Sequence, residues 1–165
     1  MASSVFPSGG LIHSFTKTLT NAQIKALPTG PGDVEILAAP GGGNVAVLVS
    51  AYMTINTVAG AYTNVDATAF CRILNSEDDT VSIYNRRFKT ALEFGSISGQ
   101  LLLPLTIPDS ENTVGYTEDL AVTTGSLVLS GGNGALGAFT GGHASNYMNV
   151  SIAYLLMNVT TGAYS

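Results

Sequence analysis

The spacing that most resembles a chemical motif is a run of six residues rich in glycine. Residues 132–137 read Gly-Asn-Gly-Ala-Leu-Gly, which fits the pattern of a dinucleotide-binding turn. Such a turn binds a pyrophosphate only where its glycines open a helix whose free amide groups meet the phosphates. Residues 139–142 read Phe-Thr-Gly-Gly and cannot continue that helix. We therefore expect no cofactor here, and none elsewhere in the chain.

Nucleophilic catalysis would need a base close to a serine or a cysteine. A catalytic triad requires a buried histidine that a carboxylate orients, but His13 lies near the N-terminus and His143 in a glycine-rich stretch. Residues 95–99 resemble a nucleophile elbow, except that Ile97 stands where the serine is required. The only cysteine, Cys71, lies in an apolar stretch, where a buried and inert thiol is expected. We expect no hydrolase site.

Acidic residues occur in three short groups. Residues 77–79 could offer oxygen ligands to calcium, but a solvated turn is favoured because consecutive strand residues point to opposite sides. The pair Asp109 and Glu111 and the pair Glu118 and Asp119 could act as acid and base on a sugar. Nothing in the sequence brings these carboxylates together, and the chain has no tryptophan to stack on a sugar. We expect no metal site and no enzyme activity.

The chain carries few charges and is acidic. Only 10% of its 165 residues are charged and the net charge is −5, whereas about 25% are charged in an ordinary soluble domain. Nucleic-acid binding needs clustered basic residues; the only basic cluster, residues 86–89, predicts a solvated turn, with an acidic patch of a partner as the alternative contact. No apolar run approaches the ~20 residues that span a bilayer, and residues 1–15 lack the features of a secretory signal. We expect neither nucleic acid nor a membrane as a partner. With so few charges, we expect some apolar surface to be covered by a partner protein.

The elements that must position any site are mostly strands. Serine, threonine and asparagine total 44 residues and glycine adds 19, which suits strands and turns. Thr20 and Gln23 have capping-box spacing and Pro28 ends the run, so one short helix is predicted at about residues 20–27. Alternating apolar positions predict strands at residues 34–38, 45–56, 68–74, 81–84, 91–94, 101–107, 121–129 and 148–157. Residues 125–142 are expected to form one long flexible loop or hairpin tip.

This pattern predicts an all-β protein, an antiparallel β-sandwich of jelly-roll type with one short N-terminal helix. We expect a single domain over residues 19–165 and an extended arm over residues 1–18. The arm interleaves apolar side chains with proline, glycine and serine. It either packs on another molecule or is a partly ordered terminus.

Three segments of the N-terminal third carry a family resemblance. Residues 19–28 read Leu-Thr-Asn-Ala-Gln-Ile-Lys-Ala-Leu-Pro, and residues 34–41 and 45–49 follow with Val-Glu-Ile-Leu-Ala-Ala-Pro-Gly and Val-Ala-Val-Leu-Val. Together with residues 66–68 and the final strand around Tyr154, they make the chain similar to a group of small structural proteins of tailed bacteriophages. The resemblance covers about 50 residues well and the remaining 115 loosely, and it marks no active site.

The resemblance implies a β-sandwich protein of the virion exterior that cements or decorates the capsid. Its partners would be the major capsid protein and further copies of itself, expected as a homotrimer. The alternative is a host-surface-binding module of a head or tail fibre, which would use residues 131–146 with Phe139 and Tyr147. For the leading hypothesis we expect two sets of residues to make the contacts: capsid-binding Val5, Phe6, Leu11, Ile12 and Phe15, and a subunit interface of Leu155, Leu156 and Met157.

Overall fold

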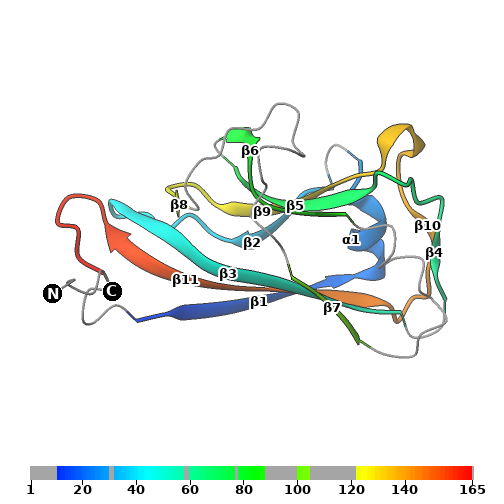
Figure 1. Cartoon of the computed structure of the whole chain (residues 1–165), viewed down its shortest axis with the longest axis horizontal. Coiled ribbons are helices and arrows are strands. Elements are labelled where there is room, and N and C mark those ends of the chain that lie inside the picture. The colour runs from blue at the N-terminus through cyan, green and yellow to red at the C-terminus, as the bar shows by residue number, and fades with distance from the viewer. Residues whose placement is uncertain are drawn as a thin grey trace, which may run out of the picture.

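The protein is a β-sandwich. A computed structural model describes residues 11–29, 32–57, 60–76, 78–87, 100–104 and 122–164. In these residues two antiparallel sheets pack against each other, and a single short α-helix lies at one end (Figure 1). The predicted fold class, mostly antiparallel strands with one short helix near the N-terminus, is confirmed.

Sheet A is the longer layer. Its strand order is β1-β11-β3-β7, with β8 paired to the first part of β3. In Figure 1 this sheet extends beyond the other at the end where β11 finishes and β3 begins. The strands are β1 (His13–Thr20), β11 (Tyr147–Asn158), β3 (Asn44–Asn56), β7 (Gln100–Pro104) and β8 (Val122–Thr123).

Sheet B covers the central part of sheet A and has the order β2-β9-β5-β6. A separate two-stranded ribbon, β4 with β10, stands at the end of the sandwich next to the helix (Figure 1). The strands of sheet B are β2 (Val34–Leu37), β9 (Leu127–Gly132), β5 (Phe70–Asn75) and β6 (Asp78–Arg87). The ribbon is formed by β4 (Tyr62–Thr63) and β10 (Thr140–Gly141), and η1 (Gly134–Leu136) is one 3-10 turn.

The helix α1 (Asn21–Ala26) has the cap that the sequence predicts. The side chain of Thr20 accepts from the backbone N–H of Gln23, and the Gln23 side chain accepts from the backbone N–H of Thr20, so both halves of a capping box are present. Ile24 and Leu27 are buried on one side. The cap and these two side chains hold six residues in a helix that would be too short to form alone.

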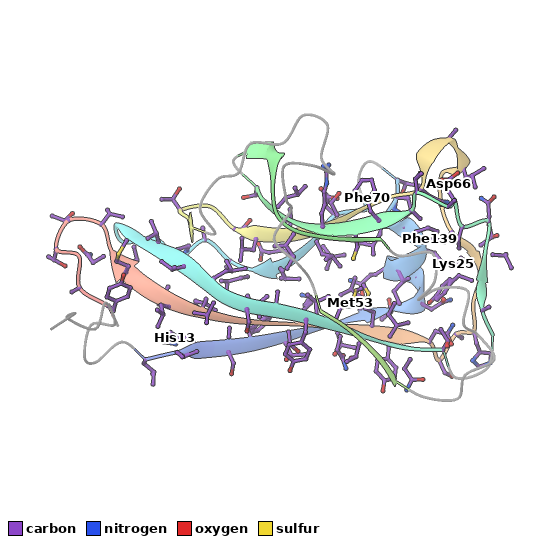
Figure 2. The ribbon with its side chains drawn as sticks, in the orientation of Figure 1. His13, Lys25, Met53, Asp66, Phe70 and Phe139 are labelled. Atoms are coloured by element: carbon purple, nitrogen blue, oxygen red, sulfur yellow. The ribbon has the colours of Figure 1, made fainter. Side chains whose placement is uncertain are left out.

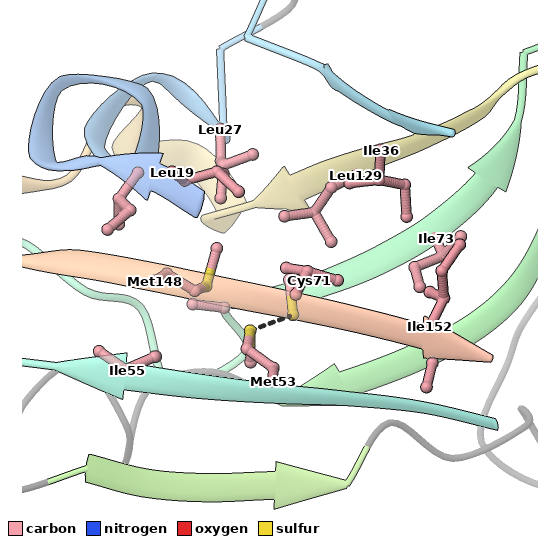
Figure 3. Close-up of a cluster of buried hydrophobic side chains, with 14 of the residues drawn as sticks. Leu19, Leu27, Ile36, Met53, Ile55, Cys71, Ile73, Leu129, Met148 and Ile152 are labelled. Carbon is pink, nitrogen blue, oxygen red and sulfur yellow. Dashed lines mark hydrogen bonds between the residues drawn. The ribbon is translucent and has the colours of Figure 1, made fainter. Parts of the chain in front are cut away.

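The core lies between the two sheets. Ile55, Met53 and Met148 point inward from sheet A, and Cys71 and Ile73 point inward from sheet B, all within 2% of complete burial (Figure 3). The Cys71 thiol donates to the Met53 sulfur across the layers, over 3.8 Å. The prediction of a buried thiol at Cys71 is confirmed.

The flexible loop predicted at residues 125–142 is wrong. Residues 127–132 form β9, which lies between β2 and β5 in sheet B. Gly131 and Gly132 allow β9 to pack closely against neighbouring residues and do not make the segment flexible. A Cβ on Gly131 would lie 2.9 Å from the Leu27 Cβ, and one on Gly132 would collide with the Phe70 ring. The strand predicted at 121–129 is accordingly divided into the short β8 and the later β9.

Residues 13–18, which we assigned to the arm, form most of β1. They pair with β11 in register from His13 opposite Tyr154 to Thr20 opposite Tyr147. Phe15, Lys17 and Leu19 alternate with threonines, a period-two pattern that the neighbouring proline and glycines obscured. Of the expected arm, Leu11 and Ile12 are the described residues that precede the strand.

The other predicted strands agree with the structure where it describes them. Residues 68–74 correspond to β5, residues 81–84 to the centre of β6, and residues 101–107 to β7, which is described to Pro104. The strand expected at 91–94 lies outside the described residues. Arg86 and Arg87 end β6 rather than lying in a turn.

Candidate binding surface

One part of the outer face of sheet A, on β1, β11 and β3, carries uncharged polar residues in rows. Because opposed residues of antiparallel strands share a face, the registers of β1, β11 and β3 place three rows of three residues on the side away from the core. We call these nine residues the polar grid. Its rows are Thr16, Ser151 and Tyr52; Thr18, Asn149 and Thr54; and Thr20, Tyr147 and Asn56.

Each row of the polar grid has a side-chain hydrogen bond between neighbouring strands. The hydroxyls of Thr16 and Ser151 are 2.8 Å apart. In the next row the Thr18 hydroxyl donates to the Asn149 carbonyl oxygen over 2.7 Å. In the third the Asn56 amide donates to the Tyr147 hydroxyl over 3.0 Å. These bonds orient hydroxyl and amide groups before any ligand arrives.

Charge is distributed unequally between the two sheets. The strands of sheet A contain one charged residue, Lys17, on the parity that faces the core side. The strands of sheet B contain six, which are Glu35, Arg72, Asp78, Asp79, Arg86 and Arg87. No residue from 36 to 65 or from 120 to 165 is an acid, a lysine or an arginine. The outer surface of β11 and β3 is therefore electrically neutral over its whole length.

At one end of sheet A this neutral face becomes apolar. Leu155 and Met157 continue the outer face of β11 beyond the grid, opposite Val47 and Val45 of β3. Val49, at the register shift between the two strands, is 50% exposed. We call residues 11–12, 47–49 and 155–159 the apolar end.

Two of the five predicted capsid-binding residues, Leu11 and Ile12, lie at the end of sheet A where the predicted subunit interface begins. His13 pairs with Tyr154 and stacks on its ring, with the ring centroids 5.3 Å apart. Leu11 and Ile12, immediately before His13, therefore lie next to the segment that begins at Leu155. Both are well exposed, at 66% and 59%. The predicted interface residues Leu155, Leu156 and Met157 are half-buried within β11.

Of the remaining predicted contact residues, one lies on the core side of sheet A and two are outside the described residues. Phe15 lies opposite Ile152, on the core side of sheet A, yet it is 42% exposed because β1 is the outermost strand there. Val5 and Phe6 lie outside the described residues. Sequence reasoning did not find the polar grid, although the Thr-x-Thr-x-Thr spacing of residues 16–20 was its visible signal.

The segment proposed for host recognition is anchored by buried residues, although most of its residues are exposed. Phe139 is fully buried, and its backbone N–H donates to the Lys25 carbonyl, which fixes the segment to α1 (Figure 2). Buried Asn133, in the dinucleotide-like motif, is the hub: its amide donates to the Asn64 and Gly137 carbonyls, and its side-chain oxygen accepts from the Asp66 N–H. Asn133 thus joins its own segment to the loop between β4 and β5, and the helical turn within the motif is only three residues long.

The residues considered for catalysis lie apart. His13 is in β1, whereas His143 lies in the turn before β11, where its Nδ1 accepts from the Ser145 N–H. Asp109, Glu111, Glu118 and Asp119 are outside the described residues. Among the residues that the structure does describe, no three histidine, cysteine or acidic side chains gather as a metal site would require. No helix in that part is long and apolar enough to cross a membrane.

Comparisons with known proteins give no match. No family model, no curated protein and no solved structure is similar enough to the chain to be recognised. A functional assignment therefore rests on the surface and on the resemblance described for residues 19–49.

Proposed function

We propose that this protein is a structural component of a tailed-bacteriophage virion, a cement or decoration protein that binds the major capsid protein on the outside of the capsid. In this role it adds buried area across the seams of the lattice and performs no covalent chemistry. Copies of the chain assemble with one another, and the resemblance implies a trimer.

The observation that carries the proposal is the apolar end. Exposed apolar side chains are normal when scattered, but a contiguous group without charges marks a protein contact. Leu11, Ile12 and Val49 are each at least half exposed, and residues 11–16, 44–50 and 153–164 contain no acid, lysine or arginine. Such a surface gains by burial against another protein of the particle.

The test is binding to capsids from which the chain has been removed. A co-sedimentation titration would compare the unmodified protein with the variant Leu11→Asn/Ile12→Asn, which keeps β1 complete. We expect the variant to bind about 10-fold or more weakly, since two well-buried aliphatic side chains contribute more than 1.4 kcal/mol. Leu136→Asn is the matched control, because Leu136 is 44% exposed at the other end of the molecule.

Equal binding by the Leu11→Asn/Ile12→Asn variant and the unmodified protein would refute the assignment of Leu11 and Ile12 as capsid contacts. Absence of any binding by the unmodified protein would refute the cement function. A host-surface module is the competing function, and it predicts binding to host cells or glycans. Of the two aromatic residues expected for that alternative, Phe139 is buried and Tyr147 is half-buried.

A further inference from the structure

We infer that the polar grid is the surface through which copies of this chain meet. The inference rests on the proposed function and deepens it, because it names where the self-assembly occurs. It also moves the expected subunit contact from residues 155–157 alone to the whole outer face of sheet A.

The first argument is electrostatic. Each copy carries a net charge of −5, so copies repel one another wherever their charged surfaces meet. The polar grid and the outer positions of β11 beyond it, from Ala153 to Met157, contribute none of that charge. Two copies that meet on this face bring no charges together and desolvate none, which avoids the largest cost of burying surface.

The second argument is that the grid is complementary to itself. A face of lysines or of glutamates cannot pair with its own copy, whereas a hydroxyl can donate or accept and an amide does both. Thr16, Thr18, Thr20 and Tyr52 are the exposed hydroxyls of the grid. Thr18 and Thr20 donate their protons within the chain and can still accept from a second copy, whereas Thr16 and Tyr52 can donate or accept. Tyr52 also offers an amphipathic ring, the type of side chain that is enriched in interfaces.

The third argument is size. β11 has 12 residues and is therefore about 40 Å long, and three strands side by side are about 14 Å wide. Because β1 has eight residues, the third strand covers about 27 Å of this length, and the plane of the face is roughly 500 Å² before the relief of the side chains is counted. Specific interfaces at the small end bury about 600 Å² per partner. With the relief of its side chains, the face is about as large as a small interface requires.

The experiment is sedimentation velocity over a concentration series with two matched variants of the full chain. Thr16→Lys places a charge on the polar grid and removes a hydroxyl–hydroxyl bond of 2.8 Å to Ser151. Thr63→Lys removes an equivalent bond of 2.8 Å, to Thr140, and places the same charge on the β4–β10 ribbon. Both threonines are exposed, so neither change threatens the core.

The added lysine distinguishes association through the polar grid from association through any other surface. It makes the net charge less negative, so general repulsion between copies falls and association through any other surface becomes easier. Burial of the grid predicts the opposite, because the new charge would lose its water. We expect the dissociation constant of the assembly to rise about 100-fold in Thr16→Lys and to stay unchanged in Thr63→Lys.

Three results would overturn the inference. These are an unmodified protein that stays monomeric at micromolar concentrations, a Thr16→Lys variant that assembles as tightly as the unmodified protein, and a monomeric protein that binds neutral glycans through the grid. Capsid binding is read separately. Capsid binding with intact assembly of Thr16→Lys leaves the cement function standing and removes this inference. If assembly requires the grid but the protein does not bind capsids, this inference stands and the cement function is refuted.

Discussion

The two faces of sheet A are built from the same strands and differ in what they do. On the inner face, Leu19, Met148 and Ile55 form one row and are at most 2% exposed. One position further along each strand, the outer row is Thr20, Tyr147 and Asn56. The alternation of side chains across a strand lets one sequence hold the sandwich together and present a neutral hydroxyl surface. Changes on the inner face should therefore affect stability, and changes on the outer face should affect assembly.

The largest expected difference between the faces is the cost of removing a large side chain. Ile73→Ala leaves a cavity in the core and should lower the free energy of unfolding by about 2–5 kcal/mol. Tyr52→Ala truncates a larger side chain that is 46% exposed, and its cost should stay below about 1 kcal/mol. Chemical denaturation of both variants measures the contrast. Equal losses would mean that the outer face also stabilises the single chain.

A pair of asparagines gives the next largest difference. Asn133→Ala removes three hydrogen bonds in a residue that is 2% exposed. It should cost about 2–3 kcal/mol, since the Asp66 N–H and two carbonyls lose their partner. Asn149→Ala removes one bond on the outer face and should cost under about 1 kcal/mol. Thermal melts of the two variants compare them, and a larger loss for Asn149→Ala would contradict the account.

Much of this arrangement could be predicted from the sequence, and the omissions have local causes. The helix was predictable because its cap is coded by two residues three positions apart, and the long strands because their apolar positions alternate. The later part of β9 was missed because its last two residues are Gly131 and Gly132, whose role depends on Leu27 and Phe70 in distant segments. Local sequence does not reveal such contacts.

The candidate surface was predictable only in part. Leu11 and Leu155 were identified as contact residues by their apolar character, without any sign that β1 and β11 would bring them together. The polar grid was missed because threonine, serine and asparagine carry no motif. That these residues share one face can be recognised only from the register of the three strands, which places them in rows.

Titration of Tyr62, in the β4–β10 ribbon, predicts a loss of stability at alkaline pH. Burial raises the pKa of Tyr62 from 10.0 to about 12, an effect that the Asn146 side chain partly offsets. The folded state therefore holds this phenol neutral, so its contribution to stability is complete below pH 10 and is lost as pH rises toward 12. Tyr62→Phe should remove up to about 2 kcal/mol of that alkaline loss.

The smallest expected difference lies within the polar grid. Thr20→Ala removes the N-cap of α1 and should lower the free energy of unfolding by about 1 kcal/mol. Thr18→Ala, two residues earlier on the same face, loses one exposed bond to Asn149 and should cost under about 0.5 kcal/mol. Urea titration of both resolves the pair. If Thr18→Ala lowered the free energy of unfolding more than Thr20→Ala, the hydrogen bonds of the outer face would stabilise the fold more than the helix cap does.

Side-chain footprinting of the assembled protein tests the central claim most directly. Tyr52 on the polar grid and Leu136 on η1 have nearly equal exposure in the single chain, 46% and 44%. Hydroxyl-radical labelling, normalised to the intrinsic reactivity of each residue, should show Tyr52 protected in the assembly and freely labelled in monomeric Thr16→Lys. Leu136 should be labelled equally in both. Labelling of Tyr52 at the same rate in assembly and monomer would contradict the claim that copies of the chain bury this face.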